Sequence, residues 1–258
     1  MNIYNWNCPK LRVRLNDPQF ISQLQICEKD VNIMKNIIDF NTQKKHDNDI
    51  IYPTNNRNID LPKSNVEYFV DFETMNKYFG RENMIYLIGM YVKYPDNTCE
   101  FFKYFAKDMT NDSQVKIVTE WRNKINEINN NYNCIGNIYC WSNAENNFMN
   151  MYNRMNPNNK MEIKFHDLKN TIKENNILIK DNIYGFSIKS VSKYMKLHNL
   201  VDISYEDSEC SAGDMSIISA LEYYENGNKA KFNELIEYNK IDCILMYEIL
   251  NYFRNYFS

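Results

Sequence analysis

Two carboxylates lie two positions apart in a run of strand-forming residues, "VEYFVDFETM" at positions 66–75. Because the side chains of a strand alternate between its faces, Asp71 and Glu73 share one face and Phe72 takes the other. Two like charges side by side on a half-buried face repel each other and are costly to desolvate. A divalent metal ion held by hard oxygen ligands would compensate, whereas an edge strand with both acids in water would need no ion.

A tyrosine and a third carboxylate are spaced for one face of a helix near the end of the sequence. In "IEYNKIDCILMYEIL", Tyr238 and Asp242 are four residues apart, so they lie one above the other on a helix. Apolar residues such as Leu235 and Leu245 share that face, which places the hydroxyl and the carboxylate against the domain body. The alternative is an ordinary amphipathic helix with one acid at its margin.

Two more acids follow the ends of predicted strands. Glu145 opens a helix directly after "IYCWS", and an acid in the first turn of a helix is favoured by the helix dipole even without a chemical role. Asp167, in "FHDL", follows a short strand. It is a candidate metal ligand, a group that supports the ligands, or an N-cap for the helix after it.

The elements that must position these residues have the order of an α/β protein. Three apolar or aromatic runs, "EYFVDFETM", "NMIYLIGMYVKY" and "CEFFKYFAK", are separated by short polar stretches and predict an antiparallel meander. A helix over 113–131, a strand at "CIGNIYCWS", a helix over 144–155 and a short strand at "MEIKFHD" come next. Mainly helical sequence then continues to about residue 256, so we expect a mixed sheet flanked by helices.

The sequence before the first of these strands has a different character. Apolar residues at helical spacing within positions 20–41 predict one or two helices, and the polar stretch that follows, with Pro53 and Pro62, reads as a linker. We therefore divide the chain into a helical N-terminal segment with its linker, residues 1–62, and one α/β domain, residues 63–258.

Composition restricts the class of protein. With 44% hydrophobic and 14% aromatic residues the chain can bury a sizeable core, and no apolar run reaches the roughly 18 residues of a membrane span. Seven scattered cysteines without a CxxC pair, and three histidines apart from them, disfavour a zinc site and fit reduced thiols. The N-terminus has no signal-peptide pattern, so we expect an intracellular protein that is not secreted.

Charge gives a weaker indication of a partner. The formal net charge of −3 provides no global attraction to nucleic acid, but residues 160–196 hold eight lysines against four acids. Such a segment is either a solvated face or part of a groove for phosphates.

The order of these motifs resembles the DEDD group of ribonuclease-H-like 3′–5′ exonucleases, in its tyrosine-bearing (DEDDy) branch. More narrowly, the chain resembles predicted nucleases that are joined to RecB-type nuclease or helicase modules. The resemblance covers about residues 66–254 and rests on "YFVDFET", "YLIGMYV", "IYCWSNAE", "FHDLKNTI", "YGFSIKSVSKYM" and "IEYNKIDC". It implies a ribonuclease-H-like mixed sheet whose first three strands are antiparallel.

The resemblance also implies a site for two Mg²⁺ or Mn²⁺ ions with four carboxylate ligands: Asp71, Glu73, Glu145 and Asp242. Asp71 would bridge the ions, and Tyr238 would orient the attacking water. The wider superfamily carries Asp where this chain has Glu145, whereas the narrower family uses Glu; Asp167 remains a further candidate ligand. If the resemblance holds, Lys189 and Lys193 would contact phosphates and Tyr184 and Phe186 would stack on a base; the alternative is that each is an ordinary surface or core residue.

The function predicted in this way is metal-dependent 3′–5′ exonuclease activity on DNA, at single-stranded ends, in repair or replication. A catalytically silent module that binds nucleic acid or a partner protein is the alternative from another class, and the same chemistry on RNA is a third. The presence of every expected acid favours the enzyme, and DNA is favoured over RNA. A helicase or RecB-type nuclease is the implied protein partner.

Overall fold

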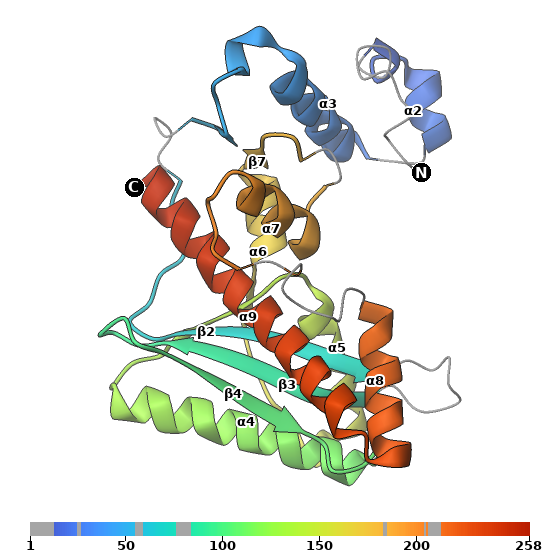
Figure 1. Ribbon diagram of the computed structural model, residues 1–258, viewed down its shortest axis with the longest axis vertical. Helices are drawn as coiled ribbons and strands as arrows, with labels where there is room; N and C mark the ends of the chain where they lie inside the picture. Colours follow the sequence, from blue (N-terminus) through green and yellow to red (C-terminus); the bar gives the residue numbers. More distant parts are fainter. Residues whose placement is uncertain are drawn as a thin grey trace.

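A mixed five-stranded sheet forms the centre of the computed structural model, which describes residues 13–24, 27–54, 59–75, 84–182, 185–203, 205 and 213–258 (Figure 1). The strand order is β4-β3-β2-β5-β6. The strands are β2 (Glu67–Met75), β3 (Met84–Lys93), β4 (Cys99–Phe105), β5 (Asn137–Cys140) and β6 (Phe165–Asp167).

The pairing of the strands follows the sequence prediction. β2, β3 and β4 pair antiparallel, and β5 and β6 are added in parallel on the other side of β2. The predicted meander and the mixed sheet are thus confirmed. β6 is shorter than its predicted run, since only three residues of "MEIKFHD" pair with β5.

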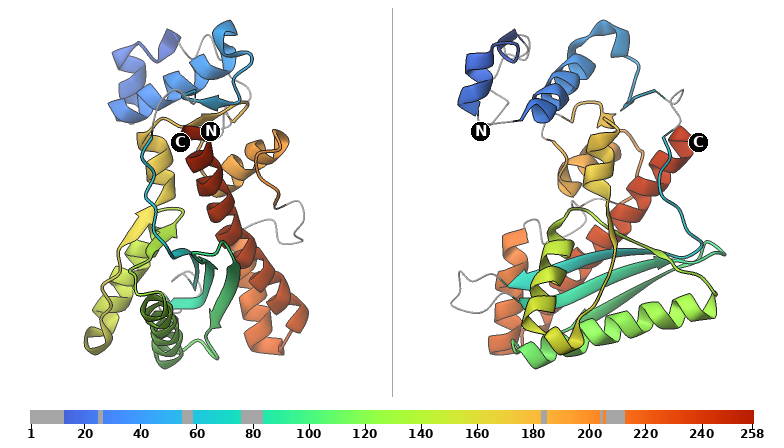
Figure 2. Two further views of the ribbon diagram at one scale, coloured as in Figure 1. Left: turned by 90° about the vertical axis from the view of Figure 1, so that its left-hand side faces the viewer. Right: turned by 180° about the vertical axis from the view of Figure 1, so that it is seen from behind.

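Eight α-helices are described, and two of them cover opposite faces of the sheet (Figures 1 and 2). α4 lies along one face, and α9 crosses the other. The helices are α2 (Pro18–Leu24), α3 (Glu28–Thr42), α4 (Asn111–Asn131), α5 (Ala144–Met155), α6 (Leu168–Glu174), α7 (Ile188–Leu197), α8 (Gly213–Asn226) and α9 (Lys229–Phe257). Two short 3₁₀ turns are also present, η2 (Lys44–His46) and η4 (Pro157–Asn159).

The alternation of β2 separates two hydrophobic clusters. Val70 and Phe72 belong to the cluster beneath α4, where Phe72 meets Trp121 at a ring-centroid distance of 5.4 Å. Phe69 points to the other side and belongs to the cluster beneath α9, stacked 5.1 Å from Tyr139. Asp71 and Glu73 therefore face α9, because they share the parity of Phe69.

A buried ion pair fastens the C-terminal part of α9 to the start of β2. The guanidinium of Arg254 donates to both carboxylate oxygens of Glu67, with N···O distances of 2.6 and 2.9 Å. The hydroxyl of Tyr139 donates to the same carboxylate at 3.0 Å. Both carboxylate oxygens of Glu67 are thus paired, as a buried charge needs, and the geometry of the pair fixes where α9 crosses the sheet.

The N-terminal segment contacts the main domain through a small second sheet. β1 (Ile51–Tyr52), in the predicted linker, pairs antiparallel with β7 (Leu178–Ile179). The ammonium of Lys173 lies 3.3 Å from a carboxylate oxygen of Asp30, which joins α6 to α3. Figure 2 shows α3 at the end of the molecule beyond α6 and α7.

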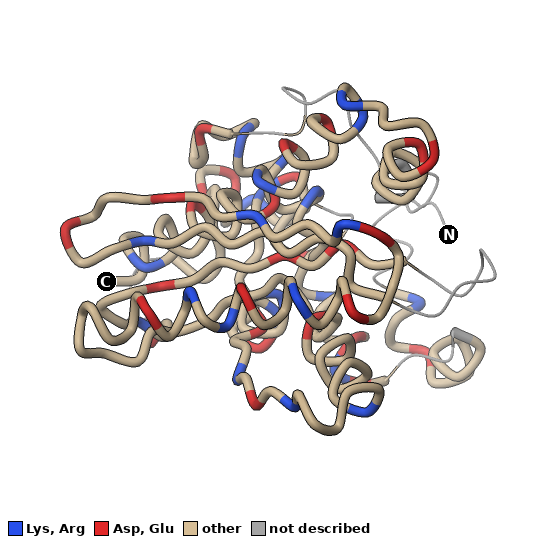
Figure 3. Tube along the Cα trace, turned by 90° about the horizontal axis from the view of Figure 1, so that it is seen from below, with Lys and Arg blue, Asp and Glu red and all other residues tan. Residues whose placement is uncertain are grey.

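Both signs of charge are interspersed over the molecule (Figure 3). Among the described residues, no helix has the length and apolar character needed to cross a membrane.

Candidate metal centre

Three carboxylates from two elements converge on the α9 face of the sheet. Asp71, Glu73 and Asp242 each offer an oxygen, and these oxygens all lie within 4.8 Å of one another. The first two come from the central strand β2, and the third comes from the helix that crosses it. Glu73 and Asp242 are buried, whereas Asp71 keeps partial exposure. The structure thus brings together three of the four predicted acids.

Asn239 holds Asp71 in place. Its amide nitrogen lies 2.7 Å from Oδ2 of Asp71 and 3.3 Å from the main-chain oxygen of the same residue. Gly89 pairs with Asp71 across β2 and β3, and a Cβ atom at Gly89 would fall 1.8 Å from Oδ1 of Asn239. Only a glycine at the centre of "YLIGMYV" leaves room for this approach. A glycine inside an apolar strand was the available signal, since it marks a close approach of another chain segment.

Burial raises the pKa values of all three carboxyl groups, and repulsion by neighbouring acids adds to this for Asp71 and Glu73. Burial first, and then the charges of Asp242 and Glu73, raise the pKa of Asp71 well above its ordinary value. Burial raises the pKa of Glu73 to about 7 and that of Asp242 to about 6. The cluster is therefore costly to ionise in the absence of a cation, as expected for like charges in a desolvated site.

Neutral hydrogen-bond donors support two of the acids. The hydroxyl of Ser216, on α8, donates to Oε2 of Glu73 at 2.8 Å. The hydroxyl of Tyr205 donates to Oδ1 of Asp242. Hydrogen bonds from Tyr205 and Tyr238 lower the pKa of Asp242 and oppose part of the effect of burial. Ser216 and Tyr205 were missed in the sequence, because neither belongs to a motif with a recognisable spacing.

Tyr238 lies beside the cluster together with a lysine. Its ring centroid is 5.9 Å from that of Tyr205, and the ammonium of Lys189 lies 5.0 and 5.2 Å from the two centroids. Burial, followed by the nearby carboxylates, raises the pKa of Tyr238 above its ordinary value. The hydroxyl is therefore neutral near pH 7, so it can orient a water molecule but is a poor base. The charge of Lys189 lowers the pKa values of Glu73 and Asp242, which places this cation close to the acids.

Glu145 lies near the cluster but outside the group of three. It stands in the first turn of α5 and is buried, and burial raises its pKa to about 7. The charge of Glu145 raises the pKa of Asp71, and the charge of Asp242 raises the pKa of Glu145. Oε2 of Glu145 is buried without a hydrogen-bond partner among the described residues. A buried carboxylate oxygen without a hydrogen-bond partner calls for an explanation, and a role as a metal ligand would supply one.

Asp167 acts as the N-cap of α6. Its side chain accepts a hydrogen bond of 2.8 Å from the main-chain nitrogen of Asn170. This is one of the three roles that its position allows, and it accounts for an acid at this point without a metal. The charge of Asp167 nevertheless raises the pKa of Glu145, so the two acids are neighbours.

The four predicted substrate-binding residues differ in how they lie relative to the acids. Lys189 lies beside the acids, as described above, and Lys193 is exposed one turn later on α7. Phe186 packs partly buried against the cluster beneath α9, and its main-chain oxygen accepts a 2.9 Å hydrogen bond from Trp141. Tyr184 lies outside the described residues.

The donor set fits a divalent metal ion. It consists of hard carboxylate oxygens, three of them close together and a fourth, from Glu145, without a hydrogen-bond partner in the described part of the chain. A bound cation would offset the repulsion between these acids. Three histidines in the whole sequence, none of them in this group, leave nitrogen ligands out of the set.

Comparison with known families agrees with this architecture. A family model for the RNase H superfamily matches residues 68–254, from β2 to the last turns of α9. No curated protein and no solved structure gives a significant match. The matched region contains the five-stranded sheet and every acid of the cluster. The chain therefore belongs to the RNase H superfamily.

Proposed function

We propose that this chain is a metal-dependent nuclease that removes nucleotides from the 3′ end of DNA, as a member of the tyrosine-bearing DEDD branch. The observation that carries the proposal is the meeting of Asp71, Glu73 and Asp242 within 4.8 Å, with Tyr238 one helical turn from Asp242. Superfamily membership supports a nuclease in general. The exonuclease polarity, the preference for DNA and a helicase or RecB-type partner rest on the motif resemblance.

In this mechanism Asp71, Glu73 and Asp242 would hold the metal, and Glu145 would complete the ligand set. Bound divalent ions would supply an activated water and stabilise the leaving oxygen of the phosphodiester. Tyr238 orients the attacking water through its neutral hydroxyl. Lys189 contributes positive charge for a phosphate oxygen, from its position over the rings of Tyr205 and Tyr238.

The decisive experiment follows the fate of labelled ends. Single- and double-stranded DNA and RNA, each labelled at the 5′ end, are incubated with the protein in Mg²⁺, Mn²⁺ or EDTA. We expect a ladder of DNA products shortened from the 3′ end that disappears in EDTA and with the isosteric variant Asp71→Asn. A ladder on RNA alone would show that the substrate is RNA, and internal cuts would show an endonuclease instead of an exonuclease. Binding of DNA without cleavage in either metal would refute the enzyme.

A further inference from the structure

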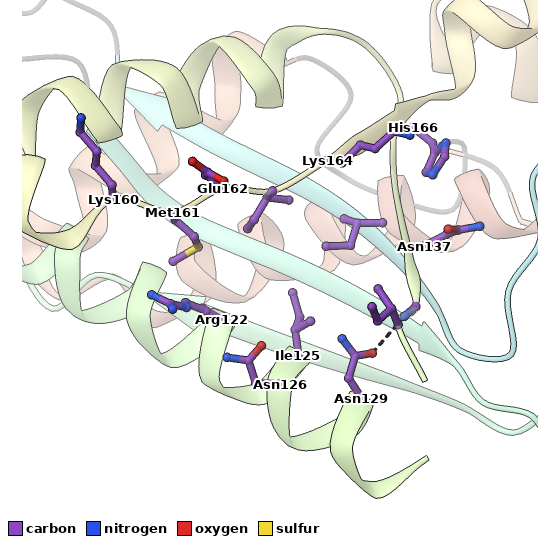
Figure 4. A pocket seen from close by; sticks show the side chains of 14 residues that line it. Arg122, Ile125, Asn126, Asn129, Asn137, Lys160, Met161, Glu162, Lys164 and His166 are labelled. Carbon is purple, nitrogen blue, oxygen red and sulfur yellow. Dashed lines mark hydrogen bonds between the residues drawn. The ribbon is translucent and has the colours of Figure 1, made fainter. Parts of the chain in front are cut away.

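A groove of about 730 Å³ lies on the α4 side of the sheet, away from the carboxylate cluster (Figure 4). β5 and β6 pair only from Ile138 and Phe165 onward. The residues before these two line opposite sides of the groove. Residues 160–164 form one wall and residues 135–137 another, while α4 closes the groove from below.

The groove combines an aliphatic lining with cations. Its apolar contacts are Ile125, Ile135, Ile138, Met161 and Ile163. Ile135 is 89% exposed and adds apolar surface at the edge of this lining. The charged side chains that line the groove are Arg122, Lys160, Lys164 and Glu162. Among the ion pairs of the described residues, none involves these three cations, and against the single acid Glu162 the groove keeps a net positive charge.

One wall of the groove presents unpaired main-chain groups. Asn153 holds Met161 through two 2.8 Å hydrogen bonds, one to its main-chain nitrogen and one to its main-chain oxygen. The next two residues, Glu162 and Ile163, form no main-chain hydrogen bond with any described residue. They precede the edge strand β6, and unpaired N–H and C=O groups beside a sheet edge are a template for another strand.

We propose that the groove binds an extended, acidic, aliphatic peptide segment of a partner protein, which adds as a strand beside residues 162–163. Such a segment would pair with the free main-chain groups, place alternate side chains on the aliphatic lining and meet the rim cations with its acids. A single strand of nucleic acid fits less well. Its recognition relies on stacking against aromatic rings, and His166 supplies the only ring among the lining residues.

The first test is a selection from random dodecapeptides displayed on phage. We expect the enriched peptides to alternate acidic and aliphatic residues and to bind at least tenfold more weakly to the double variant Lys160→Glu, Lys164→Glu. The matched control is Lys107→Glu with Lys229→Glu, which makes the same charge change at exposed lysines outside the groove. Thermal melts establish that both variants fold.

The second test reports on strand addition itself. When the best peptide is added to ¹⁵N-labelled protein, the amide hydrogen of one of the two residues, Glu162 or Ile163, is expected to exchange with solvent at least tenfold more slowly, because a strand pairs with alternate residues of its neighbour. Unchanged exchange at both residues would overturn strand addition. The peptide site would be overturned if the peptides bound the double variant and the control equally. It would also be overturned if the double variant weakened binding of an oligo(dT) 12-mer but not of the peptides. Because the groove lies apart from the acids, metal-dependent hydrolysis is expected to survive the double variant.

Discussion

The amide nitrogen of Asn239 lies 2.7 Å from the carboxylate of Asp71 and 3.3 Å from its main-chain oxygen, so one side chain of α9 fixes both the strand and its acid. This contact is possible because Gly89 has no side chain on the neighbouring strand. The position of a predicted metal ligand thus depends on two residues that carry no charge.

Replacing Asn239 by Ala is expected to weaken Mn²⁺ binding about tenfold or more. A hydrogen bond to a charged group contributes about 1.5–3 kcal/mol, and its loss frees the Asp71 carboxylate to move. Calorimetric titration with Mn²⁺ measures the effect without reference to activity. An unchanged Mn²⁺ affinity in a folded Asn239→Ala protein would show that Asp71 needs no such support.

Gly89→Ala is expected to destabilise the protein, because the new methyl group would overlap Oδ1 of Asn239. Overpacking of this kind costs about 1–3 kcal/mol in the free energy of unfolding. The double variant Gly89→Ala, Asn239→Ala should recover part of that loss, since the clashing atom is removed. Urea unfolding of the four proteins completes a double-mutant cycle. Strict additivity of the two losses would mean that the residues do not interact.

In EDTA the protein is expected to lose stability as the pH rises from about 4 to 7. Burial raises the pKa of Glu73 from 4.5 to about 7 and that of Asp242 from 3.8 to about 6, so the folded state binds these protons more tightly than the unfolded chain. Stability from such groups is present below the unfolded pKa and declines through the folded one, by up to about 1.4 kcal/mol per pH unit for each group.

The control for this pH dependence is the double variant Glu73→Gln, Asp242→Asn, in which the slope should flatten. Saturating Mg²⁺ should likewise restore the stability of the wild type above pH 7, because the bound cation replaces the protons. Urea unfolding at pH 5 and pH 8 gives the comparison. A wild type that is more stable at pH 8 than at pH 5 in EDTA would contradict the assignment of these acids to a repelling cluster.

Tyr238→Phe is expected to lower kcat at least tenfold with little change in KM. The hydroxyl would act on the attacking water, so its loss belongs to the transition state rather than to substrate binding. Tyr252→Phe, on the same helix but stacked on Tyr256 away from the acids, is the matched control and should leave both constants unchanged. A larger KM with kcat intact would instead make Tyr238 a substrate-binding residue.

Glu145→Gln should weaken metal binding and abolish most hydrolysis, whereas Asp167→Asn should change both only slightly. Asn is as good an N-cap as Asp, so the second substitution preserves the hydrogen bond to Asn170. Mn²⁺ titration and the labelled-end assay distinguish the two. If only the Asp167 variant loses metal and activity, the fourth ligand is Asp167.

The parts of the site that sequence could predict are those governed by short periods. Asp71 and Glu73 share a face because strands repeat every two residues, and Tyr238 stands over Asp242 because helices repeat nearly every four. Asn239 could not be assigned in this way, since its role depends on a contact with Asp71 across 168 positions. Tyr205 reaches Asp242 from a polar stretch with no periodic pattern.

In the fold, too, the elements with a periodic pattern were predictable and those defined by long-range contacts were not. The meander and the long helices were predictable from apolar spacing, and the predicted start of α5 agrees with its observed bounds. β1 and β7 have two residues each, too few to produce an alternating pattern, and their pairing joins segments far apart in the chain. Such short strands are recognised only by the partner that they meet.

The ion pair between Arg254 and Glu67 has a consequence for how a metal ion would be bound. α9 is attached to β2 at two points, through Arg254 and through Asn239, and Asp242 lies between them on the helix. A single-residue insertion in α9 between Asp242 and Arg254 would turn these residues by about 100° relative to each other, so both attachments could not persist. The helix can neither slide nor roll while both hold. A cation would therefore enter a site that is already ordered, and its binding should lack the large negative heat-capacity change of coupled folding.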